Sequence, residues 1–382
     1  MQHHLYNPEF KFVKRPIEFD KHTDPELLRY SLGATMYMPG TQDFAGKIIS
    51  GWLPELTSMV LCFEDACPAD KVLDAEKNTL DLLDTLANAI EDGTLSADKV
   101  PLIFCRVRSI GQFHRFAQKL TQRQARILCG FNFPKFNSRN GEAYFNYLKQ
   151  LNEELGDILY GMPILEDPKV AFKESRMTEL MAVREILDDY KGIVLQVRVG
   201  ATDFSSCFGV RRGVDYSIYD ILTVREILCD ILNVFARNND YVVSGPVWEY
   251  FRAPKEMMFQ DLPEVDIEDG LLKRHRIFNE EVDGLLREVI SDKANGFVGR
   301  TVIHPTHVRY VNALQAVTRE EYDDAMQVLR TNGGVVKSSR ANKMNEIAPH
   351  ANWAKKIAMR AKVYGVVESE RSYIDLFGRQ GD

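Results

Sequence analysis

Several features that define other protein classes are missing from this sequence. The six cysteines in 382 residues show neither CxxC nor Cys/His spacing, so we interpret them as buried thiols of a protein in the reducing cytoplasm. No apolar run approaches the ~20 residues that span a bilayer, and the N-terminus lacks the basic start and apolar core of a signal peptide. The formal net charge of −7 gives no broad attraction to nucleic acid or to anionic membranes, so we expect neither as a partner.

Signatures of covalent catalysis and of nucleotide binding are missing as well. No Ser/His/Asp set lies at a recognisable nucleophile elbow. The basic stretch 337–343 follows Gly333 and Gly334 but lacks the GxxxxGK[ST] order of a phosphate-binding loop, so we interpret it as a mobile basic loop. The chemistry of this chain is therefore expected to need neither a covalent nucleophile nor zinc.

What the sequence has is a regular alternation of apolar runs and segments of helical periodicity. The predicted strands cover residues 34–38, 58–63, 102–107, 127–133, a run ending at Glu166, a run ending at Gly200, 241–244 and 298–303. Such alternation predicts an α/β fold with a parallel sheet and helices outside it. A closed (β/α)8 barrel explains eight units better than an open doubly wound sheet, which stays the alternative.

The segments outside this alternation divide the chain further. Residues 1–30 are polar and irregular, and we expect an N-terminal arm packed across one end of the barrel. Residues 31–332 form the barrel domain, and residues 333–382 form a C-terminal helical extension that is a candidate lid for an active site. Its Glu346 and His350 are candidate proton carriers, and the alternative is an extension that packs outside the barrel.

Two of the predicted strands lead to a carboxylate, Glu166 at the end of the fifth and Asp203 just beyond the sixth. They are about one strand-helix-strand repeat apart, so both side chains are expected at the same rim of the barrel. Two oxygen ligands, with positions left for water and substrate, suit Mg²⁺. Acidic residues also follow strands as helix N-caps. The N-cap role is favoured for either residue alone, whereas two carboxylates one repeat apart at the same rim favour a metal site.

Other predicted strand ends carry Pro39, Glu64, Asp65, Arg106, Lys135 and His304. This set suits an anionic, oxygen-rich substrate held on Mg²⁺. Arg106 lies inside an apolar strand and must find an anion, because a guanidinium stays charged. A substrate carboxylate and an internal salt bridge to Glu64 or Asp65 are equal alternatives. Lys135 fits a phosphate or carboxylate contact as well as it fits a Schiff base.

Successive motifs of the chain resemble those of one enzyme family. They are Tyr-Met-Pro-Gly over 37–40, Val-Leu-Cys-Phe-Glu-Asp-Ala-Cys-Pro over 60–68, Phe-Cys-Arg-Val over 104–107, Phe-Pro-Lys over 133–135, Gly-Ala-Thr-Asp-Phe over 200–204 and Gly-Arg-Thr-Val-Ile-His-Pro over 299–305. Their order resembles the citrate lyase β-subunit-like enzymes of the HpcH/HpaI aldolase superfamily of TIM barrels. The run Met-Asn-Glu-Ile-Ala-Pro-His-Ala-Asn-Trp-Ala over 344–354 is similar to the branch called "C–C bond lyase of the TIM-barrel fold", which is associated with bacterial tellurium-resistance gene clusters.

The resemblance implies Mg²⁺, with Mn²⁺ as an alternative, held by Glu166 and Asp203, and a substrate carboxylate bound by Arg106. Glu64 and Asp65 would accept hydrogen bonds from metal-bound water or move a proton. The implied substrate-binding residues are Tyr37, Pro39, Lys135, Gly200, Ala201, Thr202 and His304.

The activity implied is cleavage or formation of a carbon–carbon bond in a carboxylate-bearing 2-oxo or 2-hydroxy acid, or its acyl thioester such as a CoA ester, through a metal-stabilised enolate. The family also implies a homo-oligomer, a trimer or a hexamer. A phosphoenolpyruvate-type Mg²⁺ barrel lyase and a non-catalytic ligand-binding barrel of a stress operon are the alternatives.

The chain departs from the family pattern at two places. The usual Asp-Leu-Glu-Asp-Ala-Val strand has Cys62 in place of its first aspartate. The usual N-terminal Arg-Ser-Leu-Leu-Phe-Val-Pro-Gly has become Gly-Ala-Thr-Met-Tyr-Met-Pro-Gly over 33–40, so its arginine is absent. An arginine there would help to hold a CoA group, so its loss weakens the case for CoA more than the case for the metal.

Overall fold

The computed structural model describes residues 1–252, 270–271 and 277–378. Its main sheet is parallel, in the order β6-β5-β4-β3-β2-β1-β7. The strands of this sheet are β1 (Ala34–Pro39), β2 (Ser58–Cys62), β3 (Leu102–Arg106), β4 (Leu128–Phe133), β5 (Tyr160–Leu165), β6 (Arg198–Val199) and β7 (Arg300–Val302). Strands β2 to β5 are buried along their whole length, because helices cover one face and interior side chains fill the other.

The segment predicted as the seventh strand, 241–244, closes the sheet into a barrel. Val243 forms a parallel bridge with Val197 beside β6, and Gly245 forms one with Arg300 of β7. This segment makes single bridges instead of a regular strand, because Pro246 follows it and a proline has no N–H to donate to a ladder. The predicted closed barrel is therefore confirmed, with its seventh strand reduced to these bridges.

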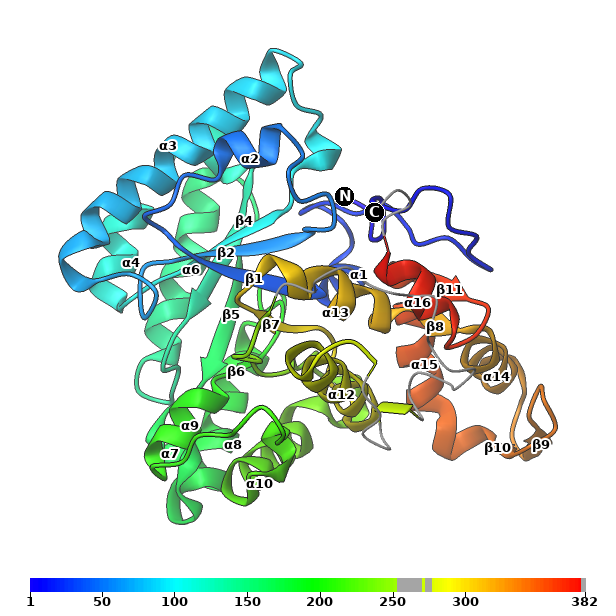
Figure 1. Cartoon of the computed structure of the whole chain (residues 1–382). Coiled ribbons are helices and arrows are strands. Elements are labelled where there is room, and N and C mark those ends of the chain that lie inside the picture. The colour runs from blue at the N-terminus through cyan, green and yellow to red at the C-terminus, as the bar shows by residue number, and fades with distance from the viewer. Residues whose placement is uncertain (253–269, 272–276, 379–382) are drawn as a thin grey trace.

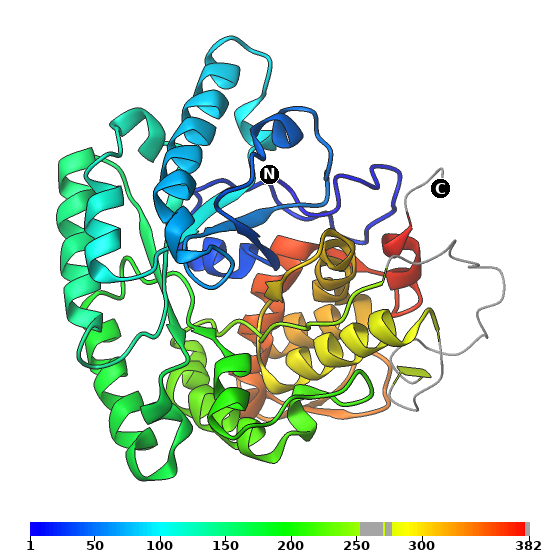
Figure 2. The ribbon, with the colours of Figure 1, turned by 60° about the vertical axis from the view of Figure 1, so that its left-hand side comes forward.

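Helices surround the sheet on its outer side (Figure 2). They are α2 (Ala45–Ile49), α3 (Val72–Glu91), α4 (Ile110–Ala117), α5 (Gln122–Ala125), α6 (Gly141–Leu155), α7 (Pro168–Ala171), α8 (Lys173–Asp189), α9 (Ala201–Cys207), α10 (Leu222–Ile231), α12 (Glu280–Asn295) and α13 (Val308–Gln315). In α3, residues at helical spacing such as Val72, Ala75, Leu82 and Leu86 are buried in the main core between helices and sheet.

The helical segment after β3 is interrupted, because α4 ends at Ala117 and α5 begins at Gln122. The break occurs because Thr121 starts a new helix: its side chain accepts from the Gln124 backbone N–H, and the Gln124 side chain accepts from the Thr121 N–H.

The N-terminal arm is less irregular than expected and contains α1 (Pro25–Ser31), which is capped by Asp24. Met1 and Phe19 of the arm, with Leu28 of α1, pack against barrel-lining residues such as Val60 and Phe104. The arm and α1 therefore cover the N-terminal ends of the strands.

The C-terminal segment packs beside this arm. It contains β8 (Val317–Thr318), α14 (Arg319–Arg330), β9 (Val335–Lys337), β10 (Met344–Glu346), α15 (Ile347–Tyr364), β11 (Val366–Val367) and α16 (Ser372–Phe377). Figure 1 shows the N-terminal segment running next to α16 and β11, and the Tyr6 hydroxyl donates to the Leu376 carbonyl. None of the described helices is both long and apolar enough to cross a bilayer.

Helix α15 also lies at the N-terminal ends of the strands. The Lys356 ammonium donates to the Gly296 carbonyl just ahead of β7, at 2.9 Å, and Asn239, just ahead of the seventh strand segment, donates to the Asn352 carbonyl at 2.8 Å. Within one chain, α15 is therefore at the opposite end of the barrel from Glu166, which follows β5. The lid role of residues 333–382 and the homo-oligomer stay predictions, and with α15 at this end such a lid would act on the site of a neighbouring chain.

The basic stretch 337–343 is not a free loop. It forms the turn of the β9–β10 hairpin, and Lys343 contacts Glu320 and Asp324, each at 3.0 Å. Acidic residues of α14 therefore pair with the basic charges of this turn, whereas its mobility stays a prediction.

Lys356 gives a test of this packing. Burial, assisted by the charge of Arg360, lowers the pKa of Lys356 from 10.5 to about 8. Between these values the unfolded chain binds more protons than the folded chain, so this lysine contributes a stability that rises with pH. Lys356→Met is expected to stabilise the protein at pH 7 by roughly 1–2 kcal/mol, after allowing for the hydrogen bond that it removes, and the gain should shrink towards pH 10.5.

Urea unfolding of both proteins at pH 7 and pH 10 measures this difference. The exposed neighbour Lys355→Met is the control and should change little at either pH. A gain that does not depend on pH would contradict the assignment to a partly buried ammonium.

Candidate active site

The guanidinium of Arg106 lies at the centre of a cluster of carboxylates at the C-terminal ends of β2, β3 and β5. Its Nη2 is 2.7 Å from Glu64 Oε2, 3.2 Å from Asp65 Oδ2 and 3.0 Å from Glu166 Oε1. These contacts raise the pKa of Arg106 despite its burial, so the group is a permanent cation. The internal salt bridge, one of the two alternatives that the sequence left open for Arg106, is present, and Glu166 belongs to it as well.

Lys135, which follows β4, contacts two of these carboxylates, Glu64 and Glu166. Its backbone N–H donates to Glu166 Oε1 at 2.9 Å, and its ammonium contacts Glu64 Oε1 at 2.6 Å. It adopts a left-handed backbone conformation, with φ of 47°, which is uncommon for a residue other than glycine. Although burial opposes the charge, the contact with Glu64 raises the pKa of Lys135. A lysine held protonated in this way suits charge stabilisation better than Schiff-base formation.

Glu166 is buried, being only 4% exposed. Burial, helped by the charge of Asp203 and opposed by that of Arg106, raises its pKa from 4.5 to about 7. Its Oε1 is engaged by Arg106 and Lys135, whereas Oε2 lies over Gly200 and forms no hydrogen bond with any described residue. A Cβ built on Gly200 would lie 2.3 Å from Oε2 and 2.6 Å from the Glu166 Cβ, so this close approach requires glycine.

Asp203 lies in the first turn of α9, directly after β6, and is half-buried. It forms no ion pair or hydrogen bond with residues in the described ranges, and its charge acts on Glu166. Two carboxylates with free oxygens thus lie near enough for the charge of Asp203 to act on Glu166, and a divalent cation between them would stabilise both charges.

Within the described residues, no group of three or more His, Cys, Asp or Glu side chains is arranged to hold a metal. A site with two protein carboxylates agrees with the preference of Mg²⁺ for keeping several water ligands. The residues present therefore fit Mg²⁺ and do not fit structural zinc.

Glu64 and Asp65 differ in exposure. The Glu64 side chain is 10% exposed and is held by Arg106 and Lys135. The Asp65 side chain is 59% exposed. Burial opposes ionisation of Asp65, but hydrogen bonding with Glu64 and the charge of Arg106 lower its pKa. Asp65 is therefore the ionised, solvent-accessible carboxylate of the cluster.

The other predicted site residues surround this cluster less closely. Pro39 ends β1, Ala201 is buried at the start of α9, and Thr202 is exposed beside it. His304 stacks on Phe251, with ring centroids 4.2 Å apart, and in the described part of the chain no hydrogen bond or ion pair joins it to the Arg106 cluster. Burial lowers the pKa of His304.

A polar group inside the barrel was not predicted. Asn132 donates to the Tyr37 hydroxyl at 2.5 Å, and the Arg198 guanidinium lies 5.6 Å from the centre of the Tyr37 ring. Tyr37 was predicted as a substrate contact, but Asn132 and Arg198 were not. The signal available in the sequence was a charged or amide residue inside an apolar strand, the same signal that identified Arg106.

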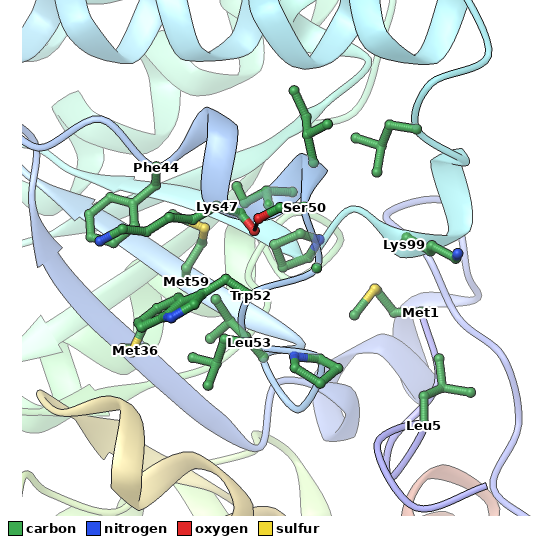
Figure 3. A pocket seen from close by; sticks show the side chains of 17 residues that line it. Met1, Leu5, Met36, Phe44, Lys47, Ser50, Trp52, Leu53, Met59 and Lys99 are labelled. Atoms are coloured by element: carbon green, nitrogen blue, oxygen red, sulfur yellow. Dashed lines mark hydrogen bonds between the residues drawn. The ribbon is translucent and has the colours of Figure 1, made fainter.

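A cavity of about 430 Å³ lies elsewhere (Figure 3). Phe44, Lys47, Trp52 and Met59 line one side of it, and Met1 lines the other. Other lining residues, such as Pro101, directly precede a strand. This cavity therefore belongs to the N-terminal end of the barrel wall and not to the Arg106 cluster.

The close approach at Gly200 can be tested directly. Gly200→Ala places a methyl group against Glu166 and is expected to destabilise the fold by about 1–3 kcal/mol through overpacking. Gly192→Ala is the matched control, because a Cβ there meets nothing within 4 Å, and its effect should stay within about 0.5 kcal/mol. Thermal or urea unfolding measures both, and equal effects would contradict the packing of Glu166 on Gly200.

Solved structures of similar fold exist. Protein CitE from Mycobacterium tuberculosis, in complex with magnesium, acetoacetate and coenzyme A, has a TM-score of 0.52 and 16% identity over 87% of this chain and 99% of its own. Malate synthase from Haloferax volcanii, in a magnesium/glyoxylate complex, has a TM-score of 0.50 and 12% identity over 73% of this chain and 74% of its own. At these identities the likeness shows the fold. No curated protein gives a significant match.

The family described as "C-C_Bond_Lyase of the TIM-Barrel fold" matches residues 26–366. The match spans nearly the whole chain, includes the strand ends that carry the Arg106 cluster, and confirms the resemblance seen in the sequence motifs. The chain therefore belongs to the C–C bond lyases of the TIM-barrel fold.

Proposed function

We propose that this lyase is Mg²⁺-dependent and acts on a carboxylate-bearing 2-oxo or 2-hydroxy acid, or on its acyl thioester. The observation that carries the proposal is the pair Glu166 and Asp203, two carboxylates at adjacent strand ends with free oxygens. The magnesium in the CitE and malate synthase complexes supports the same choice of metal, with Mn²⁺ as the alternative. The small carboxylate ligands of those complexes support the class of substrate.

The metal would be held by Glu166 Oε2 and Asp203, and when bound it would supply Lewis-acid stabilisation of an enolate oxygen. Residues of the chain itself would bind the substrate carboxylate. The Nη1 donors of Arg106 form no hydrogen bond with described residues, so they can bind the substrate carboxylate. Lys135 stays protonated and, through Glu64, holds the guanidinium in position.

Asp65 is the residue we assign to proton transfer. Its side chain is open to solvent and contacts Arg106, so a substrate carboxylate bound there would lie next to it. Glu64 has both oxygens engaged and acts as a positioning residue. Because the pKa of Asp65 is lowered, it enters the reaction ionised, as an acceptor of a proton or of a hydrogen bond from water.

The free acid is the substrate form that this chain favours over the CoA thioester. The segment leading into β1 begins with Gly33 where related enzymes carry an arginine. Without that arginine, the phosphate groups of CoA lack one cation that would bind them. The binding of a carboxylate by Arg106 does not depend on that residue.

Mg²⁺ binding is the first test of the proposal. Glu166→Gln and Asp203→Asn are each expected to weaken Mg²⁺ at least tenfold in calorimetry, because each removes one of the two carboxylate ligands. Glu142→Gln, in the exposed first turn of α6, is the matched control and should leave the affinity unchanged. Unchanged affinity in both site variants would rule out this metal site.

Arg106 provides the second test. Lysine keeps the charge but lacks the planar fork, so Arg106→Lys is expected to lower kcat/KM by about tenfold for each ~1.4 kcal/mol of transition-state stabilisation that the fork provides. Turnover of candidate 2-hydroxy and 2-oxo acids by both proteins measures the ratio. Wild-type kinetics in the variant would leave Arg106 with only the structural salt-bridge role.

A further inference from the structure

Arg198 is a buried guanidinium without an anionic partner in the part of the chain that the structure describes. It is 1% exposed. Its hydrogen bonds go to neutral oxygens, at 3.3 Å to Thr35, 3.1 Å to Gln196 and 2.8 Å to Thr301. Its Nε has no partner among the described residues. A buried charge without a counter-ion costs several kcal/mol, so the site has a positive charge available for a ligand.

Other buried arginines of this chain show how such charges are normally neutralised. Arg212 and Arg300 are both buried, and each forms an ion pair with Glu288. Both belong to the network that fixes α12 outside the barrel. Arg360 of α15 is also buried without an ion pair in the described structure, but the charge of Glu321 acts on it. Arg198 is as buried as these arginines and contacts only neutral oxygens, which argues against a purely structural role.

The surroundings of Arg198 contain further unsatisfied groups. The side chain extends from β6 to Tyr37 and Thr35 of β1, so it crosses the barrel interior. Tyr37 is bonded to Asn132, which is the register partner of Arg106. Neither the Asn132 Oδ1 nor the Arg106 Nε has a hydrogen-bond partner in the described structure. Because unpaired buried atoms are uncommon in folded proteins, these groups mark a polar region directly next to the Arg106 cluster.

We propose that this region is a second anion-binding subsite, in which Arg198 binds a second anionic group of the substrate. The proposal rests on the proposed function and narrows it: the substrate is a dianionic acid, with one carboxylate at Arg106 and the other at Arg198. Bound water could pair the free N–H groups but cannot neutralise the charge. The subsite would select dianionic over monoanionic acids, because a monoanionic acid leaves the buried Arg198 charge uncompensated.

Calorimetry with two stable 2-hydroxy acids tests the subsite, using malate as the dianion and lactate as the monoanion, both with Mg²⁺. The wild type is expected to bind malate at least tenfold more tightly than lactate. In Arg198→Gln, malate binding should fall at least tenfold, while lactate binding stays within twofold. Arg319→Gln removes the same charge from the exposed start of α14 and is the matched control, with no change for either acid.

A second variant covers the case in which Arg198→Gln does not fold. Gln196→Glu keeps the side-chain volume and puts a carboxylate oxygen where the Gln196 Oε1 now accepts from Arg198 at 3.1 Å, so it would neutralise Arg198 from within the protein. Malate binding should fall selectively, as in Arg198→Gln, and thermal unfolding should show a fold at least as stable as the wild type.

Three results would overturn the subsite: equal wild-type affinity for malate and lactate, equal loss of both acids in Arg198→Gln, or an unchanged malate preference in Gln196→Glu. Each can occur while Mg²⁺-dependent acid binding persists, so the subsite can fail although the proposed function stands. If the wild type binds neither acid with Mg²⁺, the proposed function fails and the subsite fails with it.

Discussion

The ion pairs of one guanidinium join three strand ends at the C-terminal end of the barrel. Arg106 holds Glu64, Asp65 and Glu166 through a single nitrogen, Nη2. These carboxylates follow β2 and β5, and Arg106 itself ends β3, so the three strand ends are fixed relative to each other. Because a guanidinium cannot lose its proton in a protein, this centre keeps its charge at any physiological pH. The metal and the substrate would therefore bind where the charges of Arg106 and its carboxylates are already in position.

That centre also explains why Glu166 and Asp203 differ. Glu166 is buried, and burial raises its pKa to about 7, while Arg106 limits the rise. Asp203 is half-buried at the start of a short helix and has no protein partner among the described residues. One carboxylate is positioned by the fold, and the other is left free. A site built in this way binds a cation through few protein ligands and leaves room for water and substrate.

Buried arginines in this protein have different roles, and burial alone does not separate them. Arg300 is fully buried and joins Glu288 and Asp292 of α12 to β7, which is a structural network outside the barrel. Arg106 lies inside the barrel mouth and contacts Asp65, a carboxylate that reaches solvent. Arg198 lies inside the barrel with neutral partners. The position on the inner or outer face of the sheet, together with the charge of the neighbours, decides which of them can bind a ligand.

The sequence by itself determined the alternation of strands and helices, the barrel and the strand-end residues, because apolar periodicity and the carboxyl ends of parallel strands are local properties. It predicted the salt bridge of Arg106 as an alternative to substrate binding, and both roles are compatible with the geometry. Tertiary structure alone decided that Gly200 makes room for Glu166 and that Arg198 crosses the barrel to Tyr37. It also decided that α15 lies at the far end of the barrel. These facts depend on contacts between residues far apart in the chain, and no local pattern encodes such contacts.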